Sequence, residues 1–536
     1  MSATDEDLSL RREIIEALLG SEEALDKQAI NRIKNVVCAR HKRSDVPSNA
    51  DILEAALPEE LEVLTRLLQK RPVRTVSGVA VVAVMTSPRP CPHGRCAYCP
   101  GGPENGVPQS YTGYEPATMR GLQNDFDPYR QVESRLRQLR ATGHSVNKTE
   151  LIIMGGDWCS KEQSYRECFV KGCLDAMNGM ISRDLDEAKA LNEVSEVRNV
   201  GMTFETRPDM LTTQTVDDML KIGATRVEIG VQSLSDRVLK LVERGHDVAA
   251  TVRATKLLRD SGLKVCYHIM PGLPDSTPDS DLVGFEKLFS DSRFRPDMLK
   301  IYPTLVIKGT KLHDWWAQGD YVPYETESMV DLLARAISKM PEYVRIQRMQ
   351  RDIPIHKIEA GLNKGNLREL VHQRMEVLGL KDRTMRYREI GHYQMRTGES
   401  VSIDRLQLLR HDYEASDGIE TFLSFEEPSA DVICGFLRLR KPSQDARRPE
   451  IGAGRTAIIR ELRVYGPVVE IGKRRLGAWQ HLGLGEKLIL AAEGIARKDY
   501  GADWLLVNSG LGVKQYYRDL GFTDAGPYLV KSLRSR

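Results

Sequence analysis

The spacing of apolar residues changes twice along the chain, and each change marks a different kind of structure. Residues 1 to about 75 repeat apolar side chains at helical intervals, as in Ile14 and Leu18, which predicts short amphipathic helices. From Gly78 short β-rich runs alternate with helical stretches, and from His392 a new series of short strands begins and includes one long helix. The pattern predicts a helical N-terminal part, an alternating α/β part and a second mixed domain.

The alternating part contains six β-rich runs, at 78–85, 149–154, 200–205, 226–231, 264–270 and 298–303. Helical segments separate most of them, which predicts parallel strands joined by right-handed crossovers. We therefore expect a barrel or an open part of one. In such folds the chemistry lies at the C-terminal ends of the strands.

Composition limits the possible classes of protein. A chain of 536 residues is too long for a single core. Its net charge of +2 does not indicate nucleic-acid binding, so any basic surface must be local. No apolar run is long enough to span a membrane, and the N-terminus is polar, unlike a signal peptide. The nine cysteines are odd in number and unevenly spaced, which argues against a disulfide framework and favours the cytoplasm.

Two segments are locally basic. Residues 32–43 carry five Lys/Arg and no acid, and residues 345–388 carry eleven Lys/Arg against five Asp/Glu, an excess of six (11 − 5). Such segments can be solvated helix faces, contacts for an RNA backbone, or a surface for an acidic protein partner. The sequence leaves these three alternatives open.

The loop "CPHGRCAYCPGG" directly follows the first predicted strand and holds Cys91, Cys96 and Cys99. A structural zinc site prefers four closed ligands, usually two pairs of cysteines. A fourth ligand here would have to be His93, between the first two cysteines, where the reach is strained. An iron–sulfur cluster accepts three thiolates and leaves one iron open, so the pattern favours a cluster over zinc.

This loop resembles that of the radical S-adenosylmethionine (SAM) enzymes, although it has one residue more than their usual C-x3-C-x2-C spacing. The motifs "QSYTGYEPATMR", "TFETRPD", "EIGVQS", "HIMPGLP" and "RIQRMQRDIP" look like those of the Elongator catalytic subunit family, the tRNA carboxymethyluridine synthases. The resemblance covers essentially the whole chain. It implies a helical tRNA-binding segment (1–75), a radical SAM partial (β/α)6 barrel (76–330), a basic helical linker (331–391) and a GNAT acetyltransferase-like α+β domain (392–536).

The resemblance also implies residues that bind SAM. Gly155 and Gly156 would receive its amino group, and Asp157 stands where relatives usually have threonine. A carboxylate at this position can still accept a hydrogen bond from an ammonium. Glu205 and His268 end predicted strands and would point to the same mouth, the alternative being ordinary polar residues at strand ends.

Acetyl-CoA is the implied co-substrate. Lys148 matches a family lysine that contacts it. The stretch "QHLGLG" fits the GNAT turn that binds the coenzyme pyrophosphate through backbone amides, and the preceding strand would hydrogen-bond the pantetheine arm. Tyr517 is the candidate to approach the thioester and Tyr516 is suited to packing, with core packing the alternative for both. The remaining residues expected here are Gln480, Gly483, Leu484, Gly485 and Glu486 in the turn, and Glu461, Leu462, Arg463 and Val464 in the strand.

One family feature is missing. Many prokaryotic relatives carry zinc-binding cysteines near residues 379–391, but this chain has Asp382, Thr384 and Tyr387 at the comparable positions. We therefore expect no structural zinc there.

Together these features imply an enzyme that converts wobble uridine 34 of tRNA to 5-carboxymethyluridine. A [4Fe–4S] cluster on the three cysteines would cleave SAM, the resulting radical would activate the acetyl group of acetyl-CoA, and thioester hydrolysis would release coenzyme A. The cluster site and the acetyl-CoA site would have to face each other, with Lys148 as a bridge. The partners would be the tRNA anticodon stem-loop and an electron donor, with accessory subunits or a homodimer left open and no membrane.

Two other functions are compatible with the same motifs. A protein lysine acetyltransferase would use Glu461 as its base and the cysteine loop as a structural element. A non-catalytic tRNA-binding module would keep a degenerate cluster site.

Overall fold

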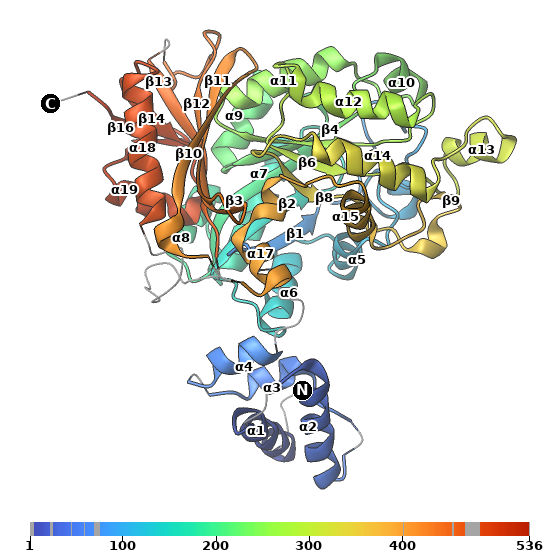
Figure 1. The fold of residues 1–536 in the computed structure, drawn as a ribbon, viewed down its shortest axis with the longest axis vertical. Helices are drawn as coiled ribbons and strands as arrows, with labels where there is room; N and C mark the ends of the chain where they lie inside the picture. Colours follow the sequence, from blue (N-terminus) through green and yellow to red (C-terminus); the bar gives the residue numbers. More distant parts are fainter. Residues whose placement is uncertain are drawn as a thin grey trace.

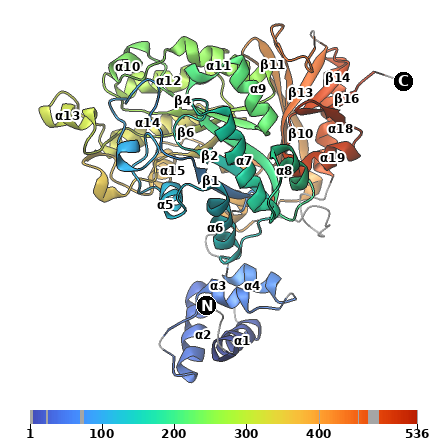
Figure 2. The same ribbon diagram turned by 180° about the vertical axis from the view of Figure 1, so that it is seen from behind.

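The N-terminal helices form a small bundle with its own core. Figure 1 shows the computed structural model, which describes residues 5–21, 25–43, 45–57, 59–68, 75–399, 401–452, 455–466 and 483–534. Apolar positions at helical spacing, such as Ile14 and Leu18, face Ile52 and Leu64 in this core. Two views (Figures 1 and 2) show the bundle as a lobe set apart from the rest of the molecule. Its helices are α1 (Asp5–Leu19), α2 (Lys27–Arg40), α3 (Asn49–Glu54) and α4 (Leu61–Leu68).

A parallel sheet of seven strands, ordered β1-β2-β3-β4-β5-β6-β8, forms the centre of the molecule. All six β-rich runs predicted from the sequence are strands of this sheet. Because the strands are parallel and follow chain order, right-handed crossovers place their helices on one face and leave the other face to line a cavity. The strands are β1 (Ala80–Met85), β2 (Lys148–Met154), β3 (Arg198–Thr206), β4 (Arg226–Gln232), β5 (Lys264–Ile269), β6 (Met298–Ile301) and β8 (Arg345–Arg348).

The helices of this part alternate with the strands, as the pattern predicts. Their ends follow local signals: Asp127 caps α6, Thr212 caps α9, and Gly179 ends α7 in a left-handed conformation. The helices are α5 (Pro116–Gln123), α6 (Pro128–Arg140), α7 (Gln163–Asn178), α8 (Leu185–Asn192), α9 (Thr213–Ile222), α10 (Asp236–Leu241), α11 (Val248–Asp260), α12 (Pro278–Ser290), α13 (Lys311–Gln318) and α14 (Thr326–Ser338).

The seventh strand corrects the expected boundary at residue 330. Strand β8 lies within the segment expected to be a helical linker, yet it pairs with β6 from Met298↔Arg345 onwards. Its sequence "RIQR" is short and basic, so hydrophobic periodicity gave no signal for it. The rest of the segment contains β9 (Ala360–Gly361), which pairs with β7 (Leu305–Val306), and helices α15 (Leu367–Val377), α16 (Met385–Arg388) and α17 (Ile390–Thr397). Helix α15 packs against α14, whereas α16 lies between β8 and β12 of the two large sheets.

The C-terminal domain is a second seven-stranded sheet, ordered β10-β11-β12-β13-β14-β16-β15. Only the β13–β14 pair is parallel among its described strands, and that pairing stops at Ile459↔Val507. The second half of β13 therefore separates from β14. The elements are β10 (Gln407–Ala415), β11 (Gly418–Glu427), β12 (Val432–Lys441), β13 (Thr456–Val464), α18 (Leu484–Lys498), β14 (Trp504–Val507), α19 (Lys514–Asp519), β15 (Thr523–Ala525) and β16 (Tyr528–Ser532).

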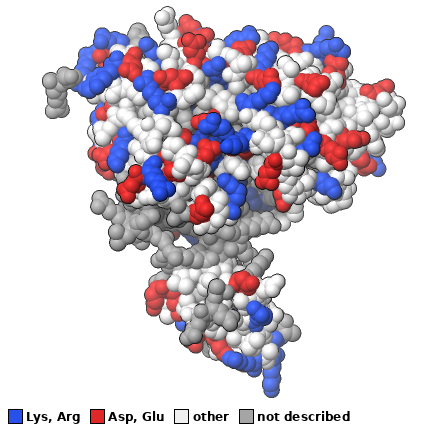
Figure 3. All heavy atoms as spheres, in the orientation of Figure 1, with Lys and Arg blue, Asp and Glu red and all other residues white. Residues whose placement is uncertain are grey.

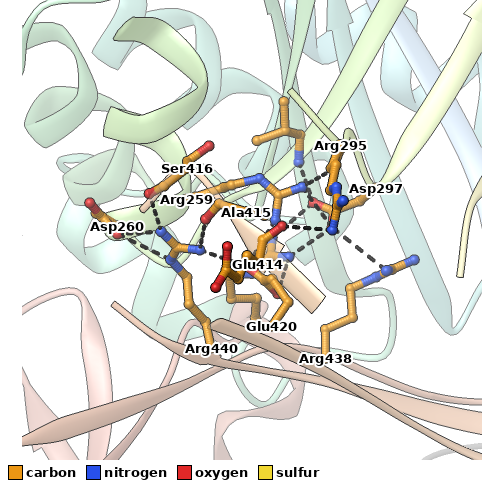
Figure 4. Close-up of polar contacts among 12 residues, drawn as sticks. Arg259, Asp260, Arg295, Asp297, Glu414, Ala415, Ser416, Glu420, Arg438 and Arg440 are labelled. Atoms are coloured by element: carbon orange, nitrogen blue, oxygen red, sulfur yellow. Dashed lines mark hydrogen bonds and ion pairs between the residues drawn. The ribbon is translucent and has the colours of Figure 1, made fainter. Parts of the chain in front are cut away.

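The two large sheets meet through buried ion pairs (Figure 4). Arg460 of β13 donates to Asp297 at 2.7 Å and to Glu420 at 2.7 Å. These side chains are fully buried, and the guanidiniums hold the pKa of Asp297 far below its usual range. The other members of the network are Arg259, Asp260, Arg438, Arg440 and Glu461. Because Asp297 immediately precedes β6, this network joins the C-terminal domain to the N-terminal ends of the parallel strands.

Among the helices that the structure describes, none combines the length and the apolar character needed to cross a lipid bilayer.

Candidate functional site

The cysteine loop lies at the C-terminal end of β1, as the sequence predicts. Cys91, Cys96 and Cys99 line one cavity of about 400 Å³ at this end of the sheet. All nine cysteines of the chain are free thiols, so the expectation of no disulfide framework is confirmed.

Hydrogen-bond donors point at the cysteine sulfurs. Gln109 donates its amide to Cys99 Sγ at 3.0 Å, and the buried Arg244 guanidinium lies 3.7 Å from Cys96 Sγ. Burial and the Asp157 carboxylate raise the pKa of Cys91 to about 12, so this thiol ionises only if a metal compensates its charge. Three clustered cysteines with donors aimed at their sulfurs fit a metal cluster.

His93 lies closer to the cysteines than expected. Its Nε2 is 3.2 Å from Cys96 Sγ, so the reach that looked strained in sequence is short in space. The loop turns back at Gly94, which has a φ of 88°, a left-handed conformation that glycine adopts without strain.

The glycine pair after β2 lies at the same mouth. Gly155 has a φ of 128°, and a Cβ there would lie 2.1 Å from Thr86 Oγ1, so only glycine fits. Gly156 lines the cavity. Asp157 is buried, with one oxygen accepting from Thr206 at 2.7 Å and the other without a hydrogen-bond partner among the residues that the structure describes. Burial raises the pKa of this carboxyl.

Glu205 and His268 belong to a charged floor of the cavity. Glu205 accepts from Tyr111 at 2.7 Å and lies 3.5 Å from the Lys300 ammonium. Lys300 also pairs with Glu228, and His268 Nε2 lies 2.9 Å from the same carboxylate. These contacts raise the pKa of Lys300 and hold that of Glu228 low, so this pair is ionised at neutral pH.

Sequence reasoning did not find Tyr111, Glu228 and Lys300. A signal existed for two of them, because Glu228 and Lys300 are charged residues inside otherwise apolar strands, and in a half-barrel such positions face the interior. Glu228, Cys266 and His268 also lie close enough together to hold a metal ion, but the Lys300 ammonium already pairs with this carboxylate.

A chain of ion pairs runs from this floor through the inside of the half-barrel. Glu228 lies 3.5 Å from Arg226, which pairs with Glu150 at the other end of the strands. Glu150 in turn lies 3.3 Å from Arg463 of β13. Buried charges therefore connect the cavity with the C-terminal domain.

The residues expected to bind acetyl-CoA gather at that other end. Lys148 is the first residue of β2, and burial lowers its pKa to about 8. The part of β13 that separates from β14 contains Glu461, Leu462, Arg463 and Val464. The two candidate sites thus do not face each other directly. They lie at opposite ends of the same parallel strands.

The expected coenzyme turn is described from Gly483 onwards. Gly483 caps α18 with a φ of 70°, and Leu484, Gly485 and Glu486 form its first turn. Gln480 lies outside the described residues. The two tyrosines have different surroundings: Tyr517 is buried with its ring 5.7 Å from that of Phe522, whereas a Cβ at Gly485 would lie 2.8 Å from the hydroxyl oxygen of Tyr516.

Glu461 is unsuited to act as a base. Its carboxylate accepts from Arg438 at 3.0 Å, and its pKa is lowered by the surrounding cations Lys264, Arg438 and Arg463, which outweigh its burial. A carboxylate held ionised in this way has little tendency to take a proton.

The basic run on α2 is partly neutralised. Arg40 lies 3.4 Å from Glu13, and Arg43 lies 2.9 Å from Asp7. Lys34 is buried and donates to Asn49. Arg32 and Lys42 remain exposed, and Figure 3 shows Lys and Arg side chains at the free end of this lobe.

The positions without the family cysteines form a hydrogen-bonded cluster instead. His372 Nε2 lies 3.0 Å from Asp382 Oδ2, and Asp382 Oδ1 accepts from the Thr384 amide at 2.8 Å. The rings of His372 and Tyr387 meet edge to face with centroids 5.1 Å apart. Ordinary side-chain contacts thus join α15 to the start of α16.

Models of known protein families match most of the chain. Residues 86–285 match the radical SAM superfamily, residues 296–377 match a radical SAM C-terminal domain, and residues 8–76 match the ELP3 N-terminal domain. The second match crosses residue 330, in agreement with the position of β8.

Curated relatives match over nearly their full length. The chain is 47% identical to "tRNA uridine(34) acetyltransferase" of Methanocaldococcus jannaschii, covering 99% of each chain. It is 44% identical to "Elongator complex protein 3" of Schizosaccharomyces pombe, covering 97% of each. A solved structure of archaeal Methanocaldococcus infernus Elp3 with an N-terminal deletion is 43% identical, with a TM-score of 0.76 over 85% of this chain and 100% of that one.

Proposed function

Because this chain belongs to the Elp3 family of radical SAM proteins, we propose that it modifies wobble uridine 34 of tRNA to 5-carboxymethyluridine, with acetyl-CoA as the source of the added carbons. The single observation that carries the proposal is the cavity at the C-terminal ends of the strands. It combines three cysteines with a polar floor of Glu205, Glu228 and His268, and the Lys300 ammonium pairs with both carboxylates of this floor.

In this proposal Cys91, Cys96 and Cys99 hold a [4Fe–4S] cluster, and Gly156 and Glu205 help to bind SAM. When bound, the cluster and SAM would supply a radical able to take a hydrogen atom from the acetyl methyl group. The chain itself binds the substrates, orients them and excludes water. Gln109 and Arg244 stabilise the thiolates, and the polar floor gives the polar groups of SAM and of the base fixed hydrogen-bond partners.

Acetyl-CoA would bind where β13 separates from β14. Unpaired strand edges can hydrogen-bond a pantetheine arm, and the start of α18 offers backbone amides to the pyrophosphate. Lys148 supplies a cation at the same end of the strands. The acetyl group must then reach the cavity through or around the half-barrel, along which the Arg463–Glu150–Arg226–Glu228 chain runs.

The test is reconstitution of the full chain with iron and sulfide under anaerobic conditions, followed by SAM, a reductant as electron donor, acetyl-CoA and tRNA. Mass analysis of the digested tRNA should show carboxymethyluridine. Cys96→Ala should abolish it, whereas Cys168→Ala, which removes an exposed thiol elsewhere, should leave it within about twofold.

A result with coenzyme A release but neither modified uridine nor 5′-deoxyadenosine would contradict the proposal. It would favour acetyl transfer without radical chemistry. The lysine acetyltransferase alternative is otherwise weakened by Glu461, whose ion pair with Arg438 makes it a poor base.

A further inference from the structure

A second cavity of about 800 Å³ adjoins the cysteine cavity. Its walls are the end of β8 with the segment after it, residues 347–353, and α15 with the turn before it, residues 365–376. The two cavities share Arg348, Arg351 and Asp352, so a ligand in one lies next to a ligand in the other. This volume is within the range of cavities that hold drug-sized ligands.

Amides and guanidiniums dominate the polar wall of this second cavity. Gln347 and Gln350 donate to Met298 Sδ and to the Lys364 carbonyl, which leaves their side-chain oxygens as acceptors. Gln373 also lines the wall, and none of the contacts found in the described part of the chain involves its side chain.

Arg368 is the free cation of this wall. It donates only to the Ile346 carbonyl, at 3.1 Å, and forms no ion pair among the described residues. Burial and the neighbouring Arg386 lower its pKa to about 9, as happens to a cation that lacks a close counter-charge. By contrast, Arg348 pairs with Asp352 at 2.8 Å and Arg351 donates to the Ser110 carbonyl at 2.6 Å.

We propose that this second cavity holds a nucleobase that neighbours the modified uridine, and that it reads the sequence context of the RNA loop. The inference rests on the proposed function, because it takes the cysteine cavity as the place of the uridine. Single-stranded RNA is recognised through splayed bases whose edges meet amide and guanidinium side chains. Glu369 and Glu376 also line the cavity, so the wall suits a neutral base better than a bare phosphate.

The experiment measures RNA binding by the full-length chain, using fluorescence anisotropy with an anticodon stem-loop. The loop carries either all its bases or an abasic site directly 5′ or 3′ of the target uridine. The protein is wild type, Arg368→Ala, Gln373→Ala or the control Lys381→Ala, which removes an exposed charge outside the cavity. Circular dichroism checks that each variant is folded, and Arg368→Lys tests whether charge alone suffices.

One abasic site should weaken binding to the wild type by about tenfold, the scale of one recognised base. Arg368→Ala should weaken binding of the intact loop to a similar degree. The abasic site and Arg368→Ala combined should lower the affinity about tenfold rather than a hundredfold, because both remove the same contact. Lys381→Ala should affect intact and abasic loops equally. The inference would be overturned if the two changes together weakened binding by the product of their separate factors. It would also be overturned if neither abasic site weakened binding.

Binding and modification are separate readouts. If the abasic site and Arg368→Ala are coupled in binding but carboxymethyluridine never forms, the proposed reaction fails and the base site stands. If modification occurs and the coupling is absent, only the base site fails.

Discussion

Tyr516 and Tyr517 are adjacent in sequence but have different environments. Tyr517 is buried against Phe522, whereas Tyr516 is partly exposed and its hydroxyl lies beside Gly485 at the start of α18. Of the two tyrosines, Tyr516 therefore has the hydroxyl beside the start of α18. A short helix turns successive residues by about 100°, so one of two neighbours faces the core and the other does not.

This difference gives a test at the residue scale. If acetyl-CoA binds as proposed, Tyr516→Phe should lower RNA-dependent release of coenzyme A by about tenfold or more, because it removes a hydrogen-bond donor beside the proposed coenzyme turn. Tyr517→Phe should change this rate less than about twofold. Tyr517→Ala should instead lower the unfolding free energy by about 3 kcal/mol. Thiol titration measures the release of coenzyme A, and thermal melts measure the stability of each variant. Equal losses of rate in the two Phe variants would contradict the placement of Tyr516 at the coenzyme site.

Lys148 predicts a pH dependence. Burial lowers its pKa to about 8, so its ammonium is present below pH 8 and is lost as the pH rises above that value. Affinity for the anionic coenzyme should therefore fall between pH 7 and pH 9. Calorimetric titration of acetyl-CoA checks this. Lys148→Arg keeps its charge throughout and should remove the pH dependence, and a wild-type affinity that stays constant over this range would exclude the role.

At the scale of elements, the segment between the two sheets is held by side chains. His372 of α15 forms a hydrogen bond with Asp382, and its ring meets the ring of Tyr387 edge to face. The segment 331–391 was expected to be a helical linker, but β8 joins the parallel sheet and α15 lines the second cavity. The position of α15 thus depends on contacts that only folding brings together.

Removing this cluster should be destabilising. Asp382→Ala leaves the buried Thr384 amide without its acceptor and should lower the unfolding free energy by about 1–3 kcal/mol. Denaturant titration measures the loss. Glu376→Ala, an exposed change on the same helix, should stay within about 0.5 kcal/mol. Addition of a chelator should leave the melting temperature of the cluster-free protein unchanged, and a large decrease would show that a metal contributes.

At the scale of the whole molecule, buried charge joins the two sheets. Arg259, Arg438, Arg440 and Arg460 meet Asp260, Asp297, Glu420 and Glu461, so four cations face four anions in the interior. Figure 4 shows Arg259, Asp260 and Asp297 of one domain close to Glu420, Arg438 and Arg440 of the other. Such a network fixes the orientation of the domains, because any rotation would leave buried charges unpaired.

Asp297→Asn should therefore lower the unfolding free energy by about 3–5 kcal/mol at pH 7. Folding depresses the pKa of Asp297, so its contribution is complete above the ordinary carboxyl pKa and is lost progressively as the pH falls below about 4. The difference between the variant and the wild type should shrink in that range. Asp291→Asn breaks an exposed pair with Arg293 and should cost less than about 1 kcal/mol.

The sequence alone determined the features that are local. The β-rich runs, the cysteine loop after the first strand and the glycine pair after the second are set by neighbouring residues, and the structure places each as predicted. Strand order also followed, because parallel strands in succession have few possible topologies.

The tertiary structure decided what depends on residues distant in sequence. The floor of Tyr111, Glu205, Glu228, His268 and Lys300 comes from four strands and one loop, and its ion pairs exist only when these meet. The same holds for the strand β8, for the arginine network and for the placement of the two candidate sites at opposite ends of the sheet. Side-chain periodicity shows which face of a strand is buried, but it does not show which charges from other strands share that interior.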